Sequence, residues 1–495
     1  MRLSELLKDI VFLPAAADRD IGRLVLDSRQ IKAGDVFFAI KGSQQDGRQY
    51  VHDAIKQGAC AILLDAHEDV AVAFEQTVPL IPVPQLQAKL GIIAARFYGN
   101  PAKQLRMIGV TGTNGKTSCT HFIAQSLQHL GIPCGIIGTL GSGFYGALGE
   151  AALTTPDPIT LQASLRKFVD EGAQAVAMEV SSHSIDQGRI NGIEFEIGVF
   201  TNLTQDHLDY HGDMQSYAAV KHRFLAECPT LHVIINADDD YGSQWIDELA
   251  ARKSVFAYAT KQPAIPAFVP RIYTDQTQWS LQGAQATVHS PWGSGELSLP
   301  LVGEFNLSNG LAVLSTLCVF GIPFSEALSC LAQLQPVAGR MQTLGEQGKP
   351  LVVVDYAHTP DALEKVLSAL RGHVAGKLIC VFGCGGERDA GKRPQMAAIA
   401  ERLADKVIVT NDNPRHEPAE TIAEHILRGF SAPDRVCVEL DRSKAIQKSI
   451  QWAATQDCVL IAGKGAERYQ QVGDVKTPFD DVKQAENCLQ NYPEK

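Results

Sequence analysis

The segment Gly109-Val-Thr-Gly-Thr-Asn-Gly-Lys-Thr117 lies between the apolar residues 107–108 and a stretch of helical periodicity from about 119 to 130. A strand, a glycine-rich turn and a helix start in this order hold phosphate, because glycines let backbone amides converge on an anion and the helix N-terminus adds its positive end. Lys116 supplies a point charge, and Thr117 offers a hydroxyl to Mg²⁺. The segment therefore predicts a site for a nucleoside triphosphate.

One position departs from the usual phosphate-loop pattern, which begins with glycine where this chain has Val110. The glycines of this chain stand instead at 109, 112 and 115. The alternative interpretation is a glycine-rich turn that contains a lysine by chance. The strand before the turn and the helix after it favour phosphate binding.

The composition is that of an ordinary globular protein. The 495 residues predict about three domains of usual size, and the hydrophobic content of 45% supports several cores. With 44 basic and 55 acidic side chains the formal net charge is −11, so we expect neither a nucleic-acid nor a membrane surface. No protein partner is inferred. Any anionic substrate must be held by local positive groups.

Cysteine usage and the lack of long apolar runs predict the compartment. The eleven cysteines are odd in number and scattered, with Cys380 and Cys384 the nearest pair, which favours a reducing environment. Charges interrupt the opening segment Met1-Arg-Leu-Ser-Glu-Leu-Leu-Lys-Asp9, and no run of eighteen apolar residues follows it. We therefore expect a cytoplasmic protein.

We expect an α/β fold of three domains. Residues 1–84 predict a small mixed α/β domain that ends in the proline-spaced segment 79–84. Residues 85–336 predict a central parallel-sheet domain of the phosphate-loop ATPase kind. The strands expected in these two domains are 24–26, 36–40 and 61–64, then 107–110, 175–180, 197–203 and 232–236.

Residues 337–495 predict a Rossmann-like, doubly wound third domain. Its expected strands, which alternate with helical segments, are 351–354, 378–382, 407–410, 436–440 and 459–462. In such sheets ligands bind beyond the carboxyl ends of the strands. The polar loops at these ends are Asp355-Tyr-Ala-His358, Gly383-Cys-Gly-Gly-Glu-Arg388, Asn411-Asp-Asn-Pro-Arg415 and Gly463-Lys-Gly-Ala-Glu467. Four such loops at one sheet edge predict one pocket.

Two further polar segments follow strands of the central domain, Glu179-Val-Ser-Ser-His183 and Thr201-Asn-Leu-Thr-Gln-Asp-His-Leu-Asp-Tyr-His211. Mg²⁺ prefers oxygen ligands and tolerates an imidazole, so Thr117, Glu179 and His207 are candidates to place it against the phosphates of ATP. For Glu179 alone, a capping or ion-pair role is an equal alternative. We interpret Asp206, Asp209 and His211 as solvated turn residues.

Three motifs together resemble the Mur ligase family: Thr-Gly-Thr-Asn-Gly-Lys-Thr at 111–117, Glu-Val-Ser-Ser-His at 179–183 and Asp-His-Leu-Asp-Tyr-His-Gly at 206–212. The resemblance covers all three domains and accounts for the glycine spacing of the phosphate loop. Within the family, Asp412-Asn-Pro-Arg415 is similar to the element of members that add meso-diaminopimelate. It implies an enzyme of peptidoglycan precursor synthesis.

The resemblance implies an ATP-dependent amide ligase. The γ-carboxylate of the D-glutamyl residue in UDP-N-acetylmuramoyl-L-alanyl-D-glutamate would attack the γ-phosphate of ATP, and an amine of diaminopimelate would attack the resulting acyl phosphate. Positioning and cations dominate such phosphoryl transfer, so Lys116 and Mg²⁺ are the expected charge-neutralising groups. Lys116, Lys221, His207 and Glu179 are the implied catalytic residues.

Lys221 would by itself be a solvated helix lysine. The resemblance implies instead that it is carbamoylated (N6-carboxylysine), which turns a cation into a carboxylate that can bind or orient Mg²⁺. The implied magnesium ligands are thus Thr117, Glu179, His207 and Lys221.

The family also implies three binding sets. The residues expected to bind ATP are Gly112, Thr113, Asn114, Gly115, Lys116, Thr117, Ser118, Asn306, Arg340 and His358. Those expected to bind the UDP-sugar dipeptide are Leu26, Ser28, Ser43, Gln44, Gln45, Thr154, Thr155, Ser181, Gln187 and Arg189. Those expected to bind diaminopimelate are Arg388, Asp412, Asn413, Pro414, Arg415, Gly463 and Glu467.

Structural alternatives exist for several of these residues. The segments around Ser28 and Gln44 are also plain turn chemistry. Asn306 would cap a helix over 307–320, and Arg340 would pair locally at a domain boundary. For the amino-acid site we expect the guanidinium groups of Arg415 and Arg388 to grip the distal carboxylate, and Glu467 to receive the distal ammonium.

Three other functions remain open from the sequence. A sister ligase adding lysine or D-glutamate, or extending folate with glutamate, would share the central loop. A kinase or nucleotide switch is disfavoured because no Asn-Lys-x-Asp element is present and two further domains surround the loop. A nonenzymatic sugar-nucleotide sensor would bind the uridine ligand without releasing phosphate from ATP.

Overall fold

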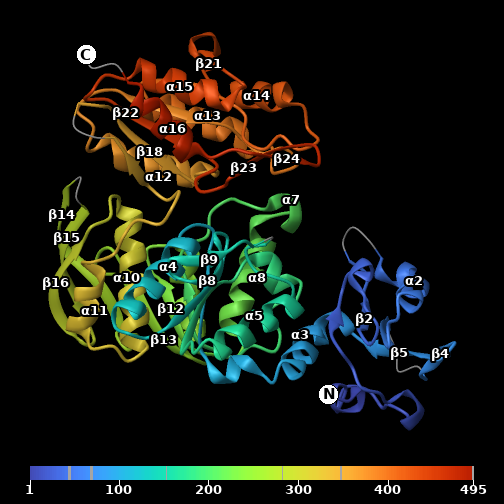
Figure 1. Ribbon diagram of the computed structural model, residues 1–495. Helices are drawn as coiled ribbons and strands as arrows, with labels where there is room; N and C mark the ends of the chain where they lie inside the picture. The colour runs from blue at the N-terminus through green and yellow to red at the C-terminus, as the bar shows by residue number, and fades with distance from the viewer. Residues whose placement is uncertain (43–45, 67–70, 152, 281–282, 346–347, 493–495) are drawn as a thin grey trace. The chain divides into compact units, whose positions relative to one another are not determined.

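The computed structural model describes residues 1–42, 46–66, 71–151, 153–280, 283–345 and 348–492 (Figure 1). The chain forms two compact units, the first made of Met1–Gly109, Gly131–Glu196 and Glu227–Thr230. The second consists of Val110–Leu130, Ile197–Ala226 and Leu231–Lys495. The division falls inside strands β6 (Arg106–Thr111) and β11 (Phe195–Phe200), so each unit has its own share of these strands.

The first unit opens with a five-stranded sheet in the order β1-β2-β3-β5-β4. Its strands are β1 (Leu24–Val25), β2 (Val36–Ala39), β3 (Ala61–Ala66), β4 (Ala73–Glu75) and β5 (Val78–Pro84). Val36 and Phe38 pack into one core, and Phe37 and Ala39 into another, so β2 is apolar on both faces. The helices are α1 (Leu3–Leu6), α2 (Val51–Lys56) and α3 (Leu86–Phe97), with short 3-10 turns at Ala15–Ala17, Ser28–Gln30, Gly47–Tyr50 and Pro101–Gln104.

Residues 79–84, the proline-spaced segment expected at the end of the first domain, belong to strand β5. Residues 80–84 of this strand pair in parallel with β3, whereas antiparallel β4 pairs with Val78–Leu80. Pro82 and Pro84 therefore lie beyond the β4 pairing, where a missing N–H is tolerated. Pro82 and Pro84 thus lie in the part of β5 that pairs with β3 alone.

The first unit continues with strands in the order β9-β8-β7-β10-β6. The elements added are β7 (Cys134–Gly138), β8 (Gly141–Phe144), β9 (Ala147–Gly149), α5 (Pro158–Asp170), β10 (Ala175–Glu179) and α6 (Ser182–Asp186). β7 and β10 are parallel, and β7, β8 and β9 form an antiparallel meander. Helix α5 begins cleanly because Asp157 caps the amides of Ile159 and Thr160, and Pro158 occupies the first position.

The second unit holds strands in the order β6-β11-β12-β13-β14-β15-β16. The new strands are β12 (Thr230–Asn236), β13 (Ser254–Ala259), β14 (Arg271–Ser280), β15 (Gly283–Ser290) and β16 (Gly293–Leu299). The helices are α4 (Lys116–His129), α7 (Leu208–His211), α8 (Met214–Ala226), α9 (Asp240–Ala250), α10 (Glu304–Val319) and α11 (Phe324–Leu331). The antiparallel extension β14–β16 was not expected from the sequence. The helix after the phosphate loop begins at Lys116, three residues earlier than about 119.

The rest of the second unit is a doubly wound sheet in the order β17-β18-β22-β19-β20-β21. Its strands are β17 (Gln342–Leu344), β18 (Leu351–Asp355), β19 (Leu378–Phe382), β20 (Lys406–Val409), β21 (Cys437–Val438) and β22 (Cys458–Ala462), and a separate hairpin pairs β23 (Tyr469–Val472) with β24 (Val475–Pro478). The helices are α12 (Pro360–Arg371), α13 (Lys392–Leu403), α14 (Ala419–Leu427), α15 (Arg442–Trp452) and α16 (Asp481–Gln490), with a 3-10 turn at Pro433–Arg435.

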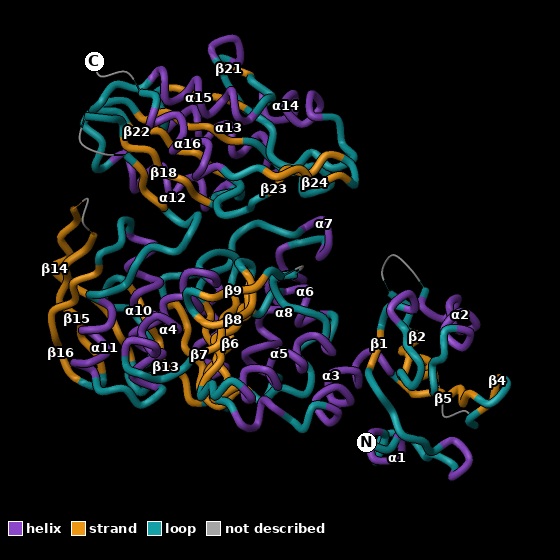
Figure 2. Tube along the Cα trace, in the orientation of Figure 1, coloured by secondary structure: helices purple, strands orange, loops and turns teal. Residues whose placement is uncertain are grey.

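Alternate residues of these strands enter two cores on opposite faces of the sheet. Cys380 and Phe382 of β19 pack with α12, α13 and α14, whereas Ile379 and Val381 pack with α15 and α16. Figure 2 shows the orange strands running between these purple helices. The expected α/β class, its parallel sheets and each expected strand are confirmed, although the strand expected at 436–440 shortens to β21.

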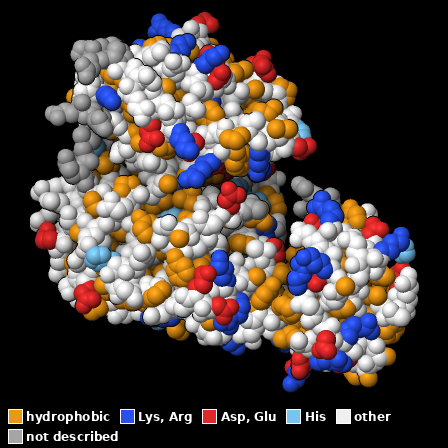
Figure 3. All heavy atoms as spheres, viewed as in Figure 1, with side chains coloured by type: hydrophobic (Ala, Val, Ile, Leu, Met, Phe, Trp, Pro, Cys, Tyr) orange, Lys and Arg blue, Asp and Glu red, His pale blue; other side chains and the backbone are white. Residues whose placement is uncertain are grey.

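Surface features add little to the functional argument. Within the described residues, no helix combines the length and apolarity needed to cross a bilayer. Figure 3 shows basic and acidic side chains interspersed over the face it draws. No disulfide joins the cysteines of the described residues.

A fully buried ion pair ties the strand ends of the doubly wound sheet together. The Arg442 guanidinium, at the start of α15, donates to both carboxylate oxygens of Asp481 at the start of α16, each over 2.7 Å. It also donates to the backbone oxygens of Asn411 (3.1 Å) and Ala462 (3.0 Å). Asn411 follows β20 and Ala462 ends β22, so one side chain fixes two of the polar loops.

Replacing Arg442 with methionine should strongly destabilise this part of the chain. The change leaves the Asp481 carboxylate and two carbonyls buried without their donor, which costs about 3–5 kcal/mol for a broken buried pair. Thermal unfolding monitored by circular dichroism should show a clear fall in melting temperature. Adding Asp481→Leu should recover part of the loss, because no buried charge then remains.

The matched control is Arg166→Met, which breaks an exposed i,i+4 pair with Asp170. This variant should lose no more than about 1 kcal/mol. Equal melting temperatures for the Arg442 and Arg166 variants would contradict the role assigned to the buried pair.

Candidate functional site

The phosphate loop is held in a shape that two glycines make accessible. Gly112 and Gly115 have φ angles of 145° and 88°, which L side chains rarely adopt. A Cβ at Gly112 would overlap the hydroxyl of Thr201 just after β11, and one at Gly115 would lie 2.5 Å from Asn309 Oδ1. The loop is therefore pressed against β11 and α10.

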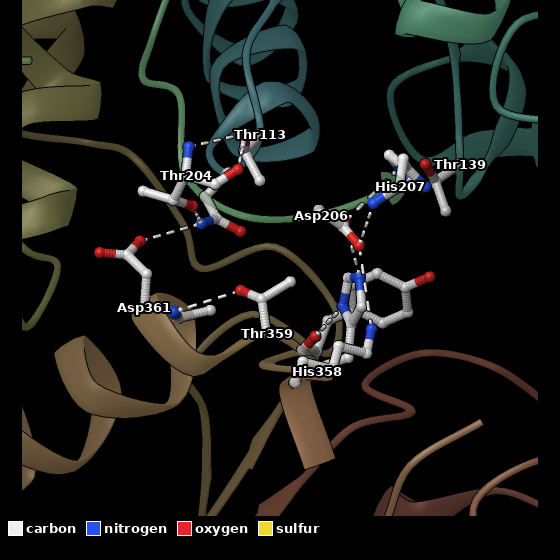
Figure 4. A network of polar contacts seen from close by, with 12 residues as sticks. Thr113, Thr139, Thr204, Asp206, His207, His358, Thr359 and Asp361 are labelled. Carbon is white, nitrogen blue, oxygen red and sulfur yellow. Dashed lines mark hydrogen bonds and ion pairs between the residues drawn. The ribbon is translucent and has the colours of Figure 1, made fainter. Parts of the chain in front are cut away.

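Polar side chains after β11 fix the loop from outside (Figure 4). The Asn114 amide N–H donates to Asn202 Oδ1 (3.0 Å), and Asn202 Nδ2 donates back to the Asn114 carbonyl (3.1 Å). The Thr113 hydroxyl accepts from the Thr204 N–H (3.0 Å), and Asn114 Nδ2 donates to Asp361 Oδ2 (3.1 Å). These contacts within the protein fix the loop geometry.

Lys116 and Thr117, which the sequence predicts as the cation and the hydroxyl of the site, lie in the first turn of α4. Lys116 Nζ donates to the carbonyls of Gly112 and Thr113, each over 2.9 Å. The Thr117 hydroxyl, on the first turn of α4, accepts from Arg340 Nη2 over 3.0 Å. Arg340 also lies over the ring of Tyr356, 4.2 Å from its centroid, so it contacts the loop and not only its local surroundings.

A cavity of about 700 Å³ opens beside the loop within the second unit. Five residues expected to bind ATP line it, namely Asn114, Gly115, Thr117, Ser118 and Arg340. Among the described residues, neither Asn306 nor His358 belongs to its lining. The phosphate loop, the start of α10 and one side of α12 along its length surround this cavity.

The alternative that Asn306 caps a helix is wrong. Helix α10 begins at Glu304 with Gly303 as its N-cap, so Asn306 lies inside the first turn. Its Nδ2 donates to the Val302 carbonyl (2.9 Å), and its Oδ1 accepts from Asn309 Nδ2 (3.4 Å). The side chain braces the loop that precedes α10.

Asp206 is a site residue that the sequence interpretation missed, since it is buried and not a solvated turn residue. Its carboxylate lies 3.4 Å from His207 Nε2, 3.5 Å from His358 Nε2 and 3.8 Å from Lys392 Nζ. Burial alone would raise the pKa of this carboxyl, but the His358 hydrogen bond and the charges of His207 and Lys392 hold the pKa well below its ordinary value. Figure 4 shows both imidazoles directed at this carboxylate.

The neighbouring polar residues behave differently. Asp209 is exposed and His211 is half-buried. The adjacency of Asp206 to His207 was the available signal, but only the fold brings in His358 and Lys392.

Lys221 is fully buried on α8, so the interpretation as a solvated helix lysine is wrong. Its Nζ donates to the Gly112 carbonyl over 2.8 Å and lies 4.8 Å from the centroid of the Tyr217 ring. Burial, with Lys116 nearby, lowers the pKa of its ammonium well below the ordinary value, against the opposing effect of Asp206. A buried amine therefore contacts the phosphate loop from the side of α8.

Glu179 ends β10 in the first unit and is 1% exposed. Its Oε1 accepts from the Thr139 N–H (2.7 Å) and its Oε2 from the Thr139 hydroxyl (3.2 Å). The other candidate magnesium ligands, Thr117, His207 and Lys221, belong to the second unit. Within the described residues, no group of three or more His, Cys, Asp or Glu side chains has metal-site spacing.

A second cavity, of about 860 Å³, lies within the first unit. Four residues expected to hold the UDP-sugar dipeptide line it, namely Leu26, Ser28, Gln187 and Arg189. Ser43, Gln44 and Gln45 lie outside the described residues. The cavity is bounded by the ends of β1 and β2 and by the loop after α6, so distant segments of the unit share it.

The remaining residues of that set form one hydrogen-bonded group. Arg189 Nη1 donates to the Thr155 carbonyl (2.8 Å), and its Nε donates to Gln187 Oε1 (2.9 Å). The Thr155 hydroxyl donates to the Glu179 carbonyl (2.7 Å) and lies 3.3 Å from the Ser181 hydroxyl. Thr154 contacts the hydroxyl of Thr139 over 3.1 Å. The group links the cavity to the end of β10.

The two arginines expected to recognise a carboxylate approach the same glycine. A Cβ built on Gly385 would lie 3.0 Å from Arg415 Nη1 and 3.6 Å from Arg388 Cγ. Arg415 has a left-handed backbone (φ 53°) and donates from Nη1 to the Gly386 carbonyl over 2.8 Å. Arg388 is exposed. The loops after β19 and β20 thus meet as expected.

The loops after β20 and β22 also meet. A Cβ at Gly463 would lie 2.7 Å from Asp412 Oδ2, and the Gly463 N–H donates to the Asp355 carbonyl over 3.0 Å. Asn413 Nδ2 donates to Glu467 Oε2 over 2.9 Å, and Pro414 is buried beside Gly386. The four polar strand ends therefore converge at one edge of the sheet.

Family comparisons divide the chain into three segments. The description "Mur ligase family, catalytic domain" matches residues 20–98, "Mur ligase middle domain" matches 110–317, and "Mur ligase, glutamate ligase domain" matches 339–465.

Relatives match over almost the full length. The chain is 50% identical over 479 residues to a UDP-N-acetylmuramoyl-L-alanyl-D-glutamate–2,6-diaminopimelate ligase of Pseudomonas aeruginosa, covering 97% of each chain. It is 49% identical over 474 residues to the protein of the same name from Coxiella burnetii, covering 96% of each.

Solved structures agree in fold. A structure of a ligase with that same name is 34% identical, with a TM-score of 0.67 and 95% coverage of both chains. A MurF ligase from Thermotoga maritima in complex with ADP is 18% identical, with a TM-score of 0.66 and coverage of 97% of this chain and 99% of that one. The expected three-domain architecture is confirmed by these matches.

His121 predicts how this region responds to acid. It is 5% exposed on α4, and burial together with the nearby Arg340 charge lowers the pKa of its imidazole to about 4. Because the unfolded imidazole binds its proton below about pH 6.5, stability should fall as the pH drops from about 6.5 to about 4, by about 3 kcal/mol in all. His121→Gln should flatten this dependence in thermal melts across that range.

The control is His129→Gln, an exposed position at the end of the same helix, which should keep the acid dependence of the native chain. If the His121 and His129 variants lose stability equally between these pH values, another group carries the effect.

Proposed function

Because the chain belongs to the Mur ligase family, we propose that it is an ATP-dependent ligase adding meso-diaminopimelate to UDP-N-acetylmuramoyl-L-alanyl-D-glutamate in peptidoglycan precursor synthesis. The family resemblance seen in the motifs is confirmed. The observation that carries the proposal is the near full-length identity to relatives named for this reaction. The proposal is also supported by the phosphate loop, which lies between strand β6 and helix α4.

The reaction proceeds by activation of a carboxylate. The γ-carboxylate oxygen of the D-glutamyl residue attacks the γ-phosphorus of ATP, and ADP leaves. The amine of diaminopimelate then attacks the acyl carbon, loses a proton and expels inorganic phosphate, which leaves an amide. Reactants and products balance without any further co-substrate.

The phosphate loop provides positioning and charge. Lys116 lies beside the loop carbonyls, and Arg340 contacts Thr117 beside the cavity. Phosphoryl transfer depends mainly on such positioning and on neutralisation of developing charge. Lys116 and Arg340 are the protein cations that we assign to the ATP phosphates, with the loop residues 112–118 around them.

The residues expected at the metal position suit Mg²⁺. Thr117 and Glu179 offer oxygen donors, His207 offers an imidazole nitrogen, and hard cations prefer such oxygen-rich sets. When bound, Mg²⁺ would neutralise charge on the β- and γ-phosphates. Asp206 holds His207 in place through the ring nitrogen contact described above.

We assign Lys221 as the carbamoylated residue. The amine is buried and contacts the Gly112 carbonyl, and a second ammonium beside Lys116 would repel a metal cation. The nitrogen attacks carbon dioxide, a nitrogen–carbon bond forms and a proton leaves, so the cation becomes a carboxylate. That carboxylate would bind or orient Mg²⁺.

The first-unit cavity is the proposed site of the uridine nucleotide. Its lining combines the Leu26–Ser28 turn with Gln187 and Arg189, and Arg189 supplies the positive charge that a diphosphate or carboxylate requires. Ser43, Gln44 and Gln45 belong to the same proposal on the strength of the family alone.

Selection of the amino acid rests on Arg415 and Arg388. The distal end of diaminopimelate carries a carboxylate that lysine lacks, and a planar guanidinium can bind it with two parallel hydrogen bonds. Both arginines lie around Gly385, and Glu467 lies across the same edge to receive an ammonium. A sister activity with lysine would leave these guanidinium groups without a counter-charge.

Three organisational points complete the proposal. The domains are taken as a UDP-sugar-binding domain over 1–84, an ATP-binding domain over 85–336 and an amino-acid-binding domain over 337–495. The sugar substrate is a cell-wall precursor linked to a nucleotide, so we place the enzyme in the cytoplasm. A folylpolyglutamate-type activity shares the fold and is separated from this proposal by substrate profiling.

In the presence of Mg²⁺ and the muramoyl dipeptide, the native enzyme should release phosphate from ATP when meso-diaminopimelate is added. Lysine in place of meso-diaminopimelate should make this release much slower. Arg415→Ala should raise the diaminopimelate KM by roughly 10- to 100-fold, because a charge-assisted grip is lost. Coupled phosphate release measures both quantities.

Arg428→Ala, an exposed arginine at the end of α14, provides the matched control and should keep the native KM. Equal use of lysine by the native enzyme would contradict the selectivity, and absence of ADP with all reactants would contradict the ligase activity itself.

Lys221→Ala should lower kcat on the order of 100-fold, because the carboxylate that orients the metal is missing. Added formate or acetate should restore part of the rate by occupying the vacated space. Lys483→Ala, an exposed lysine on α16, is the control and should match the native rate. Full activity of the Lys221 variant would rule out the assigned modification.

A further inference from the structure

Lys464 is one of the largest fully buried side chains of the protein, and nothing in the reaction proposed above uses it. It stands between Gly463 and Gly465, whose φ angles are 116° and 54°. A Cβ at Gly465 would lie 2.7 Å from the Gly339 carbonyl, so the turn is closely packed on both sides. A buried ammonium in a rigid turn requires specific partners.

The ammonium has two such partners from two different loops. Lys464 Nζ donates to Asn413 Oδ1 over 3.0 Å and to Glu467 Oε2 over 2.9 Å. Asn413 Nδ2 in turn donates to the same Glu467 Oε2 over 2.9 Å. Lys464, Asn413 and Glu467 therefore form a closed triangle of hydrogen bonds.

The orientation of the Asn413 amide within this triangle is fixed by a third donor. Its Oδ1 also accepts from the Gln471 N–H on β23 over 2.9 Å. With Lys464 and Gln471 both donating to the oxygen, the amide nitrogen has to face Glu467. A reversed amide would place its N–H groups against two donors.

The hairpin β23–β24 reinforces the same loop along its length. Gln470 Nε2 donates to the Asp412 carbonyl (2.8 Å), the Arg415 N–H donates to the Gln471 carbonyl (3.1 Å), and the Gly473 N–H donates to the Arg415 carbonyl (2.7 Å). Arg415 therefore forms an isolated parallel bridge with Val472 of β23. Arg415 is held in its left-handed conformation by these bonds.

The consequence for Glu467 is an asymmetric carboxylate. Within the part of the chain that the structure describes, Oε2 receives both hydrogen bonds and Oε1 receives none from a side chain or backbone group. Glu467 is only partly covered, with 24% of its side chain exposed, whereas Lys464 is fully buried. One oxygen is thus committed to the protein and the other is left for an incoming cation.

We propose that Lys464 is a positioning residue for amino-acid selection, which orients Glu467 through the Lys464–Asn413–Glu467 triangle so that Oε1 receives the distal ammonium of diaminopimelate. The inference rests on the proposed function and adds a residue to it. Lys464 itself touches no substrate. It sets the spacing between the ammonium-binding Glu467 and the carboxylate-binding Arg415 by tying both loops to one buried cation.

Lys464→Met keeps the length and volume of the side chain but removes its charge and donors. We expect the diaminopimelate KM to rise roughly 10- to 100-fold, as for the loss of a charge-assisted hydrogen bond. The preference for diaminopimelate over lysine should fall, because Glu467 can then swing away. The KM values for ATP and for the muramoyl dipeptide should stay within about 2-fold of native.

Lys476→Met is the matched control. Lys476 lies over the ring of Tyr469 at 4.3 Å, as Lys464 does at 5.4 Å, but it is exposed on β24 and outside the triangle. It should retain all native KM values. A purely structural role for Lys464 would instead lower the melting temperature and change all three KM values together.

A double-mutant cycle with Glu467→Gln tests the coupling. If Lys464 acts through Glu467, the double variant should raise the diaminopimelate KM little beyond the Glu467 variant alone. Independent, multiplying effects would overturn the inference, as would an unchanged KM in Lys464→Met. Should Lys464→Met fail to fold, Lys464→Arg takes its place, because the longer guanidinium displaces Glu467 and an unchanged KM again refutes the role.

The native enzyme separates this inference from the proposed function. If native protein releases no phosphate with diaminopimelate, the proposed function fails. If native protein is active and selective but Lys464→Met is equally selective, only the positioning role fails.

Discussion

The contact between the phosphate loop and the end of β11 is the constraint on which the site depends. The loop backbone approaches Thr201 so closely that Gly112 has no room for a Cβ. Asn202 then binds the Asn114 backbone on both its N–H and its carbonyl. From behind, Lys221 bonds to the Gly112 carbonyl. The residues just after β11 and on α8 therefore fix the shape of the loop that we propose as the phosphate receptor.

Buried cations hold the polar strand ends in a chain whose net charge is −11. Arg442 contacts the carbonyls of Asn411 after β20 and of Ala462 at the end of β22, and Lys464 joins the loops that follow the same two strands. Lys392 adds a third positive charge beside Asp206. Positive charge is thus concentrated at the polar strand ends, although the net charge of the whole chain is negative.

Much of the fold was predictable because strands buried on both faces give continuous apolar runs, and those runs survive without tertiary information. The antiparallel strands β14–β16 and the proline-bearing β5 were not, because their pattern is set by partners distant in sequence. For the site, motif spacing located Lys116 and Arg415. It could not reveal the burial of Asp206 or Lys464, because their partners His358 and Asn413 come from other segments that only folding brings near.

Through the Arg442–Asp481 ion pair, helix α16 helps to fix the loops that follow β20 and β22. Asp481 is the first residue of α16, so a truncated chain that stops before this helix would enclose a guanidinium with no carboxylate. Such a shortened protein would lose the clamp on the ends of β20 and β22, although it would keep every strand of the sheet. Fusions and affinity tags at this terminus are therefore best attached after Tyr492, whose side chain is buried and donates to the Ala453 carbonyl.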